Sequence, residues 1–118
     1  MTIIPARVGL QQRVFPEYRA PFFELLAKSC LQGFNLFSGL PRADEAIHTS
    51  ATLLHGAFQP AENVHLSRGR SYFLIQRGLL EWLKRWQPGV LIVEANPRYL
   101  STPAAIQWMH HRGKPVIG

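Results

Sequence analysis

The chain is poor in cysteine, in charged residues and in long hydrophobic runs, and each shortage excludes a class of protein. Cys30 is the single cysteine among 118 residues, which excludes an intramolecular disulfide. Only 17% of the residues are charged and 47% are hydrophobic, a balance that disordered chains do not have. No apolar run approaches the roughly 20 residues that span a bilayer. In residues 1–7 the basic residue follows the apolar stretch, the reverse of a signal peptide. We therefore interpret the chain as a soluble, cytoplasmic domain.

Familiar cofactor-binding patterns are also missing from the sequence. Neither Gly-x-Gly-x-x-Gly nor a Walker A sequence occurs, and Gly9 stands alone within an expected strand. The five histidines have no recognised metal-ligand spacing, and the adjacent His110 and His111 would point to different sides of a helix. The sequence thus predicts neither a metal site nor a cofactor held by this chain.

What the chain does have is an excess of positive charge. Thirteen Lys and Arg against seven Asp and Glu give a formal charge of +6. Such a surface favours phosphate groups, anionic lipid headgroups or nucleic acid. The basic residues are scattered and form no block of five or six, so a nucleic-acid interface does not follow.

Expected strands and helices alternate along the chain. A helix should run from Pro21 to Cys30, and another should begin at Thr102 and end near Arg112. Residues 39–62 give the weakest pattern, with one or two helical turns expected at 41–47. We expect strands at residues 6–14, 34–38, 63–66, 89–93 and 116–118.

The strongest helical pattern lies between these segments, at residues 72–86. Apolar residues recur there at steps of three and four and predict one continuous stripe on a helix: Tyr72, Ile75, Leu79, Trp82 and Trp86. Ser71 would serve as its N-cap, and Pro88 would enforce its end.

This order of elements predicts an α/β fold, a Rossmann-like parallel sheet with helices on both faces. We expect residues 1–118 to form a single domain of this kind. The last expected strand lacks the helix that should cover it, so we expect the domain to be incomplete at its C-terminus.

Ligands of open α/β sheets bind at the carboxyl ends of the strands, and this rule selects two loops. At the first, Arg13 and Arg19 flank the turn from the first strand to the helix, and they could steer a phosphate-bearing acceptor or could be ordinary surface arginines. In the loop after the strand at 89–93, Glu94 suits hydroxyl binding or base chemistry, Asn96 both donates and accepts, and Arg98 can bind phosphate. The alternative is that Glu94 and Asn96 bond the loop backbone while Arg98 is solvated.

Four segments resemble the N-terminal domain of glycosyltransferase family 4-like proteins: residues 13–26, 81–86, 87–102 and 112–118. The resemblance implies a GT-B fold, in which two Rossmann-like domains face each other across a cleft. The first domain generally contacts the acceptor, and the second holds the nucleotide-sugar donor. Transfer in the family generally retains anomeric configuration and needs no bound metal. This chain lacks the second domain and the paired glycines that many members carry in the first loop.

The leading hypothesis is therefore an acceptor-binding half-domain, inactive alone, of a glycosyltransferase in polysaccharide biosynthesis. Its expected partners are the missing C-terminal donor-binding domain and a glycan or lipid-linked acceptor. Peripheral contact with the inner face of the membrane fits the basic surface. The alternative is a non-catalytic basic module that binds nucleic acid or an anionic membrane, with Lys and Arg clustered on one face. A remnant without function is a third possibility.

Overall fold

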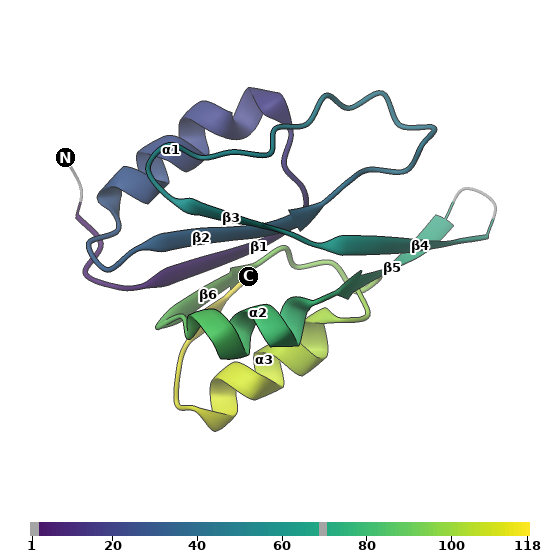
Figure 1. Cartoon of the computed structure of the whole chain (residues 1–118). Coiled ribbons are helices and arrows are strands. Elements are labelled where there is room, and N and C mark those ends of the chain that lie inside the picture. The colour runs from purple at the N-terminus through teal and green to yellow at the C-terminus, as the bar shows by residue number, and fades with distance from the viewer. Residues whose placement is uncertain (1–2, 69–70) are drawn as a thin grey trace.

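The computed structural model describes residues 3–68 and 71–118, and its centre is a parallel β-sheet (Figure 1). Within these residues the sheet has five strands in the order β3-β2-β1-β6-β7, and every pair is parallel. Its strands are β1 Val8–Val14, β2 Phe34–Gly39, β3 Ala57–Pro60, β6 Val90–Val93 and β7 Val116–Ile117. A separate antiparallel hairpin is formed by β4 Glu62–Arg68 and β5 Ser71–Arg77.

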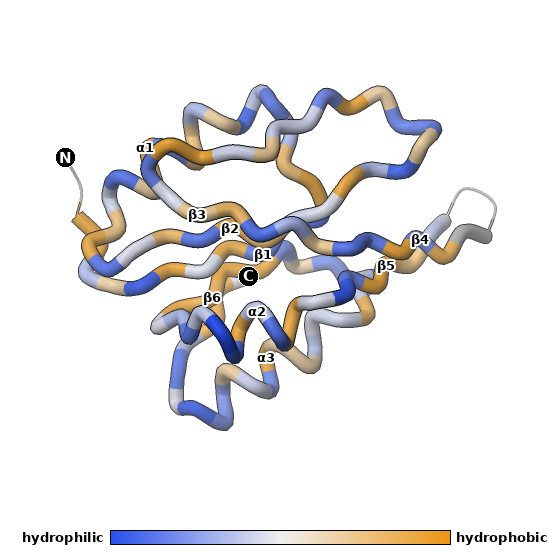
Figure 2. The backbone as a smooth tube through the Cα atoms, in the orientation of Figure 1, coloured by the Kyte–Doolittle hydropathy of each residue, from blue (hydrophilic) through white to orange (hydrophobic). Residues whose placement is uncertain are grey.

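Helices cover both faces of the sheet, as the sequence predicts (Figure 1). The 3-10 turn η1 Glu17–Arg19 leads into α1 Ala20–Ser29 on one face, and α2 Leu79–Trp86 and α3 Thr102–His111 cover the other. Leu79, Trp82 and Leu83 of α2 are buried, whereas Glu81, Lys84 and Arg85 are exposed, so one side of the helix is apolar. Figure 2 shows hydrophobic and hydrophilic residues following one another along this helix. The predicted Rossmann-like α/β fold is therefore confirmed. None of the described helices is long and apolar enough to cross a membrane.

Two apolar cores fill the spaces between the sheet and its helices. On the α1 face, Val8, Leu10 and Leu36 pack with Phe23 and Ala27. The core on the α2 and α3 face is formed by Phe37, Leu79, Trp82, Leu83, Leu91, Val93, Ala105 and Met109. Gly9 lets Trp82 approach the sheet, because a Cβ at that position would lie 3.0 Å from the indole.

The two central strands define where a ligand can bind. From β1 the chain extends the sheet to β2 and β3 on one side, and β6 and β7 then extend it on the other. The carboxyl ends of β1 and β6 therefore lie side by side at the point where the strand order reverses, with Gln11 opposite Val93. In open α/β sheets this is the usual ligand crevice.

The expected helix at 72–86 is wrong in its first half. Residues 71–77 form strand β5, and only Leu79–Trp86 is helical. Ser71 pairs with Arg68 in the hairpin and caps no helix. Gly78 separates the two elements with φ of 93°, a left-handed conformation that suits glycine. Aromatic and β-branched residues favour a paired strand here, and their helical spacing is coincidental.

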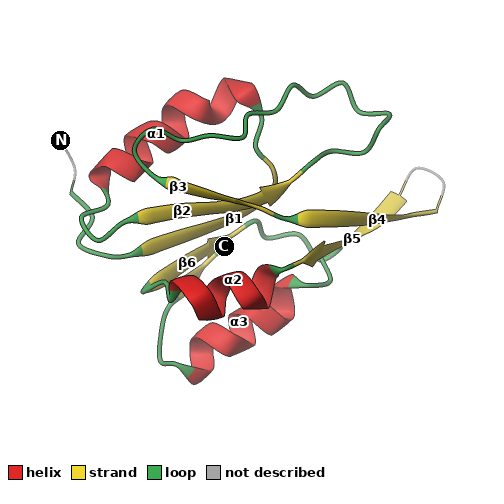
Figure 3. Ribbon diagram, in the orientation of Figure 1, coloured by secondary structure: helices red, strands yellow, loops and turns green. Residues whose placement is uncertain are grey.

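The weakly patterned segment also differs from expectation. Residues 41–47 form no helix, and the connection from β2 to β3 is an extended loop (Figure 3). Strand β3 has no counterpart among the expected strands, and the strand expected at 63–66 is part of the hairpin instead of the parallel sheet. The loop is held by its backbone, because Glu17 N–H donates to His48 O at 2.8 Å and Ser50 N–H donates to Phe15 O at 2.9 Å.

Candidate functional site

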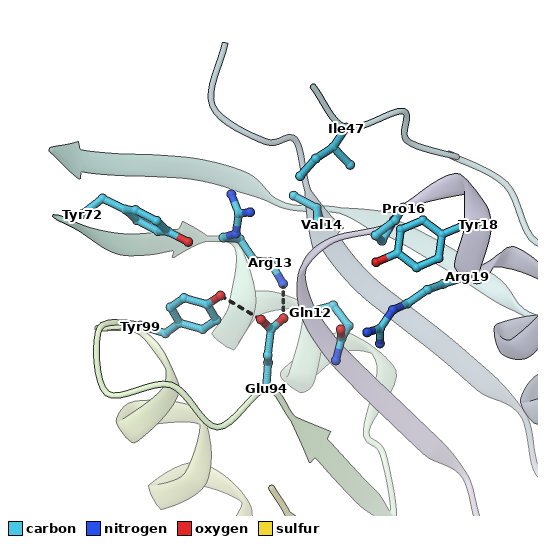
Figure 4. Close-up of a pocket in the computed structure, with 10 residues that line it drawn as sticks. All are labelled: Gln12, Arg13, Val14, Pro16, Tyr18, Arg19, Ile47, Tyr72, Glu94 and Tyr99. Atoms are coloured by element: carbon cyan, nitrogen blue, oxygen red, sulfur yellow. Dashed lines mark hydrogen bonds between the residues drawn. The ribbon is translucent and has the colours of Figure 1, made fainter. Parts of the chain in front are cut away.

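A pocket of about 280 Å³ opens at the carboxyl ends of β1 and β6 (Figure 4). Its lining comes from the end of β1, the β1–α1 connection, the loop after β6, the loop after β2 and the hairpin: Gln12, Arg13, Val14, Pro16, Tyr18, Arg19, Ile47, Tyr72, Glu94 and Tyr99. Three of the five residues selected from the sequence, Arg13, Arg19 and Glu94, are among them. The structure thus brings the two selected loops together at one site.

Glu94 directly follows β6, and its carboxylate points into the pocket (Figure 4). One oxygen accepts the backbone N–H of Arg13 at 3.0 Å, and the other accepts the hydroxyl of Tyr99 at 2.8 Å. The backbone N–H of Glu94 donates to the buried Gln11 side chain at 3.2 Å. The carboxylate is therefore fixed in position, and each oxygen retains a lone pair for a further donor.

Tyr99 is almost fully buried beside Glu94. Burial and the hydrogen bond to Glu94 raise the pKa of the Tyr99 phenol well above its usual range. The phenol consequently stays protonated and keeps donating to the carboxylate. Its position is set by the turn before it, in which the N–H of Tyr99 donates to Asn96 O at 3.0 Å.

Arg13 lines the pocket, but its charge is already compensated. Its guanidinium donates to both carboxylate oxygens of Glu45, each at 2.8 Å, and to Nε2 of His65 at 3.2 Å. The Arg13 bonds lower the pKa of Glu45 to about 2. Burial disfavours the charged form of Arg13, but the Glu45 bonds outweigh this effect and raise the pKa of the guanidinium. Arg13 therefore anchors the loop that carries Glu45 to the end of β1.

Tyr72 forms the wall of the pocket on the hairpin side (Figure 4). Arg42 lies 4.6 Å and Arg13 5.4 Å from the centre of its ring, and the His65 ring contacts it edge-on at 5.3 Å. These cation–π contacts bind the hairpin to the loop after β2. The same pair of arginines thus shapes the pocket without offering it a free charge.

Arg19 and Tyr18 lie at the mouth of the pocket, on η1 (Figure 4). Both residues belong to an exposed turn, and the guanidinium of Arg19 lies 5.9 Å from the centre of the Tyr18 ring. Within the described residues Arg19 makes no ion pair, in contrast to Arg13. Arg19 is consequently the lining arginine whose charge is available to a ligand.

Asn96 and Arg98 do not line the pocket. The side-chain oxygen of Asn96 accepts the backbone N–H of Arg98 at 2.9 Å, which closes a turn. Arg98 is exposed, and its carbonyl accepts the N–H of Leu74 at 2.9 Å. Asn96 thus shapes the loop after β6, and Arg98 joins this loop to the hairpin.

A buried amide network secures the hairpin beneath the pocket. Gln76 donates to the carbonyl of Gln12 at 2.9 Å and to Asn63 at 3.0 Å, and it accepts a hydrogen bond from Gln11. Asn63 in turn donates to the carbonyl of Arg13 at 2.7 Å. No sequence pattern indicates this network, because Gln76 falls in the segment expected to be helical. The sequence does not indicate Tyr72 as a pocket residue for the same reason.

The pocket suits an uncharged or weakly anionic ligand rich in hydroxyl groups. A fixed carboxylate accepts hydroxyl protons, aromatic rings supply apolar faces, and Arg19 adds a free cation. Within residues 3–68 and 71–118, no three His, Cys, Asp or Glu side chains lie close enough to hold a metal ion.

Comparisons with protein-family models, with curated proteins and with solved structures found no match to this chain. The class that the structure defines is a Rossmann-like α/β domain with a polar pocket at the reversal of its strand order.

Proposed function

We propose that this chain is the acceptor-binding half of a glycosyltransferase, which transfers a sugar from a nucleotide-sugar donor to a glycan or lipid-linked acceptor. The observation that carries the proposal is the Glu94 carboxylate, held by Arg13 N–H and Tyr99 OH inside a pocket rimmed by Tyr18 and Arg19. Sugar hydroxyls donate to such a carboxylate, and the apolar faces of sugar rings pack on aromatic side chains.

The proposal places the donor on a second Rossmann-like domain, as the resemblance to family 4 implies. In the transfer, the bond from the anomeric carbon to the nucleotide phosphate oxygen breaks and the nucleotide leaves with the electron pair. A bond to an acceptor hydroxyl oxygen forms, and the hydroxyl proton passes to the departing phosphate. Both substrates must be aligned and shielded from water, which a cleft between two domains achieves. We assign acceptor binding to Glu94, Arg19 and Tyr18, and no catalytic residue to this chain.

The basic surface supports peripheral contact with the inner face of a membrane, since the formal charge is +6. Several cations are nevertheless engaged within the fold. Arg13 pairs with Glu45, while Arg7 stacks on Trp86 at 3.9 Å and Arg112 on Trp108 at 4.9 Å. Because these charged groups make contacts within the domain, they are less available to nucleic acid. We therefore favour sugar recognition over a basic module that binds nucleic acid.

Saturation-transfer NMR with a panel of mono- and oligosaccharides tests this function. We expect binding to the wild-type chain, weakened at least tenfold by Glu94→Gln, because hydrogen bonds to a charged acceptor contribute about 1.5–3 kcal/mol. Glu81→Gln removes the same charge from an exposed position on α2 and should leave binding unchanged. If no saccharide binds, or if both variants bind as the wild type does, the assignment is wrong.

A further inference from the structure

A second hollow adjoins the pocket and differs from it in chemistry. It is a surface groove of about 430 Å³, lined by Glu17, Tyr18, Ala46, Ile47 and His48. Tyr18 and Ile47 line the pocket as well, so the two spaces are contiguous. Figure 4 shows Ile47 and Tyr18 on the side of the pocket away from Tyr72 and Tyr99. A ligand held at Glu94 that extends past Tyr18 therefore meets the groove.

The groove offers apolar surface between two polar side chains, Glu17 and His48. Ile47, Ala46 and the ring of Tyr18 provide this surface, and Tyr18 is 76% exposed. An aromatic ring and an aliphatic side chain that face the same open groove gain free energy when an apolar group displaces their water.

The wall of the groove is held in place on both sides. Glu45, next to Ala46, is tied to Arg13 by two hydrogen bonds of 2.8 Å. Beyond Ile47, the carbonyl of His48 accepts Glu17 N–H at 2.8 Å, and Thr49 forms a β-bridge with Pro16. Residues 46 and 47 thus lie between two segments that are fixed by hydrogen bonds. The groove is therefore formed before a ligand binds.

We infer that the acceptor is an amphiphile: its sugar or other hydroxyl-bearing head binds at Glu94, and its apolar aglycone lies along the groove over Tyr18, Ala46 and Ile47. This inference rests on the proposed function and narrows it, because an unsubstituted glycan would leave the groove empty. Tyr18 divides the two parts of the site, with its ring at the junction between head and aglycone.

A series of alkyl glycosides tests the inference. Methyl, butyl, hexyl and octyl glycosides of glucose, galactose and mannose, kept below their micellar concentrations, are titrated against the chain with the Ile47 methyl groups observed by NMR. For the hexose that binds, we expect affinity to rise about two- to fourfold for each added methylene until the groove is filled. Glu94→Gln should weaken every member of the series by a similar factor.

Ala46→Glu places a charge in the groove without touching the polar pocket, and Ala51→Glu is the matched control at an exposed alanine outside both. We expect Ala46→Glu to reduce the ratio of octyl to methyl affinity at least tenfold and Ala51→Glu to preserve it. Equal affinity for methyl and octyl glycosides would contradict an amphiphilic acceptor but would leave the proposed acceptor-binding function standing. A chain-length effect that survives Ala46→Glu would also contradict the amphiphilic acceptor. If no glycoside binds at Glu94, both proposals fail.

Discussion

Glu45 is the residue that most directly links the loop after β2 to the sheet. Two hydrogen bonds from Arg13, supported by the N–H of Arg42, lower its pKa to about 2 from the usual 4.5. A carboxyl group with a lowered folded pKa adds stability that is complete above the unfolded pKa and is lost as pH falls through the folded value. The stability of the domain should therefore decline between about pH 4.5 and pH 2.

Denaturant unfolding of Glu45→Gln measures this contribution. We expect a loss of about 3 kcal/mol in the free energy of unfolding at pH 7, because Arg13 is left buried without its partner. The decline below pH 4.5 should also become shallower. Glu62→Gln is the control, since Glu62 pairs with Arg77 at 3.7 Å on the exposed surface and such pairs contribute about 0–1 kcal/mol. Equal losses in the two variants would contradict a structural role for the Arg13–Glu45 pair.

His65 titrates in a different range. Burial, together with the nearby charge of Arg13, lowers its pKa, and its neutral ring accepts a hydrogen bond from Arg13. A histidine with a lowered folded pKa contributes stability above the unfolded value of about 6.5 and loses it as the pH falls further. We expect His65→Asn, which keeps an acceptor but does not titrate, to flatten the stability profile between pH 7 and pH 5. A profile identical to that of the wild type would show that His65 does not sense this range.

At this scale the sequence identifies part of the site. Arg13, Arg19 and Glu94 can be found because a single rule, the carboxyl ends of strands, fixes their place once the strands are known. The rule does not separate residues within one loop, so it selects Asn96 and Arg98 and passes over Tyr99. Glu45 and Ile47 belong to a loop without periodicity, and only the folded chain shows that Ile47 lines the pocket and that Glu45 pairs with Arg13.

Among the elements, the junction of β5 and α2 is the main error of sequence reasoning. The spacing of Tyr72 and Ile75 fits a helix, but pairing with β4 buries Leu74 and Gln76 on alternate positions of a strand. Local spacing cannot reveal a partner strand, and a short apolar run fits both periods. The helices α1 and α3 are recognisable because proline at their first turn and apolar spacing agree.

Substitution of Gly78 tests whether the left-handed backbone between β5 and α2 requires glycine. Its φ is 93°, and the Phe37 ring lies 3.9 Å from the place that a Cβ would occupy, so the cost of a side chain lies mainly in the backbone. We expect Gly78→Ala to cost about 1 kcal/mol and Gly78→Val more, with Gly78→Asn the mildest because asparagine tolerates left-handed backbone. Thermal unfolding ranks the three, and a Val variant as stable as the Asn variant would contradict this account.

For the whole molecule, the sequence predicts the class of fold but not the order of its strands. Alternation of strand and helix signals implies a parallel sheet, whatever route the chain takes through it. The connection from β2 to β3 has no helix, and a hairpin lies between β3 and α2, so the usual spacing of βαβ units is interrupted at 40–77. Neither departure can be inferred from the sequence, because both depend on contacts between distant residues.

The side-by-side placement of β1 and β6 also determines when the pocket can form during folding. The bond between Arg13 N–H and Glu94 joins residues 81 positions apart, and the amide bond from Gln76 to Gln12 joins residues 64 apart. Closing such long loops costs chain entropy before any contact compensates for it, so topologies of this kind fold slowly. We therefore expect the pocket to form only after β6 has joined β1, because a nascent chain still lacking β6 also lacks Glu94, which follows that strand.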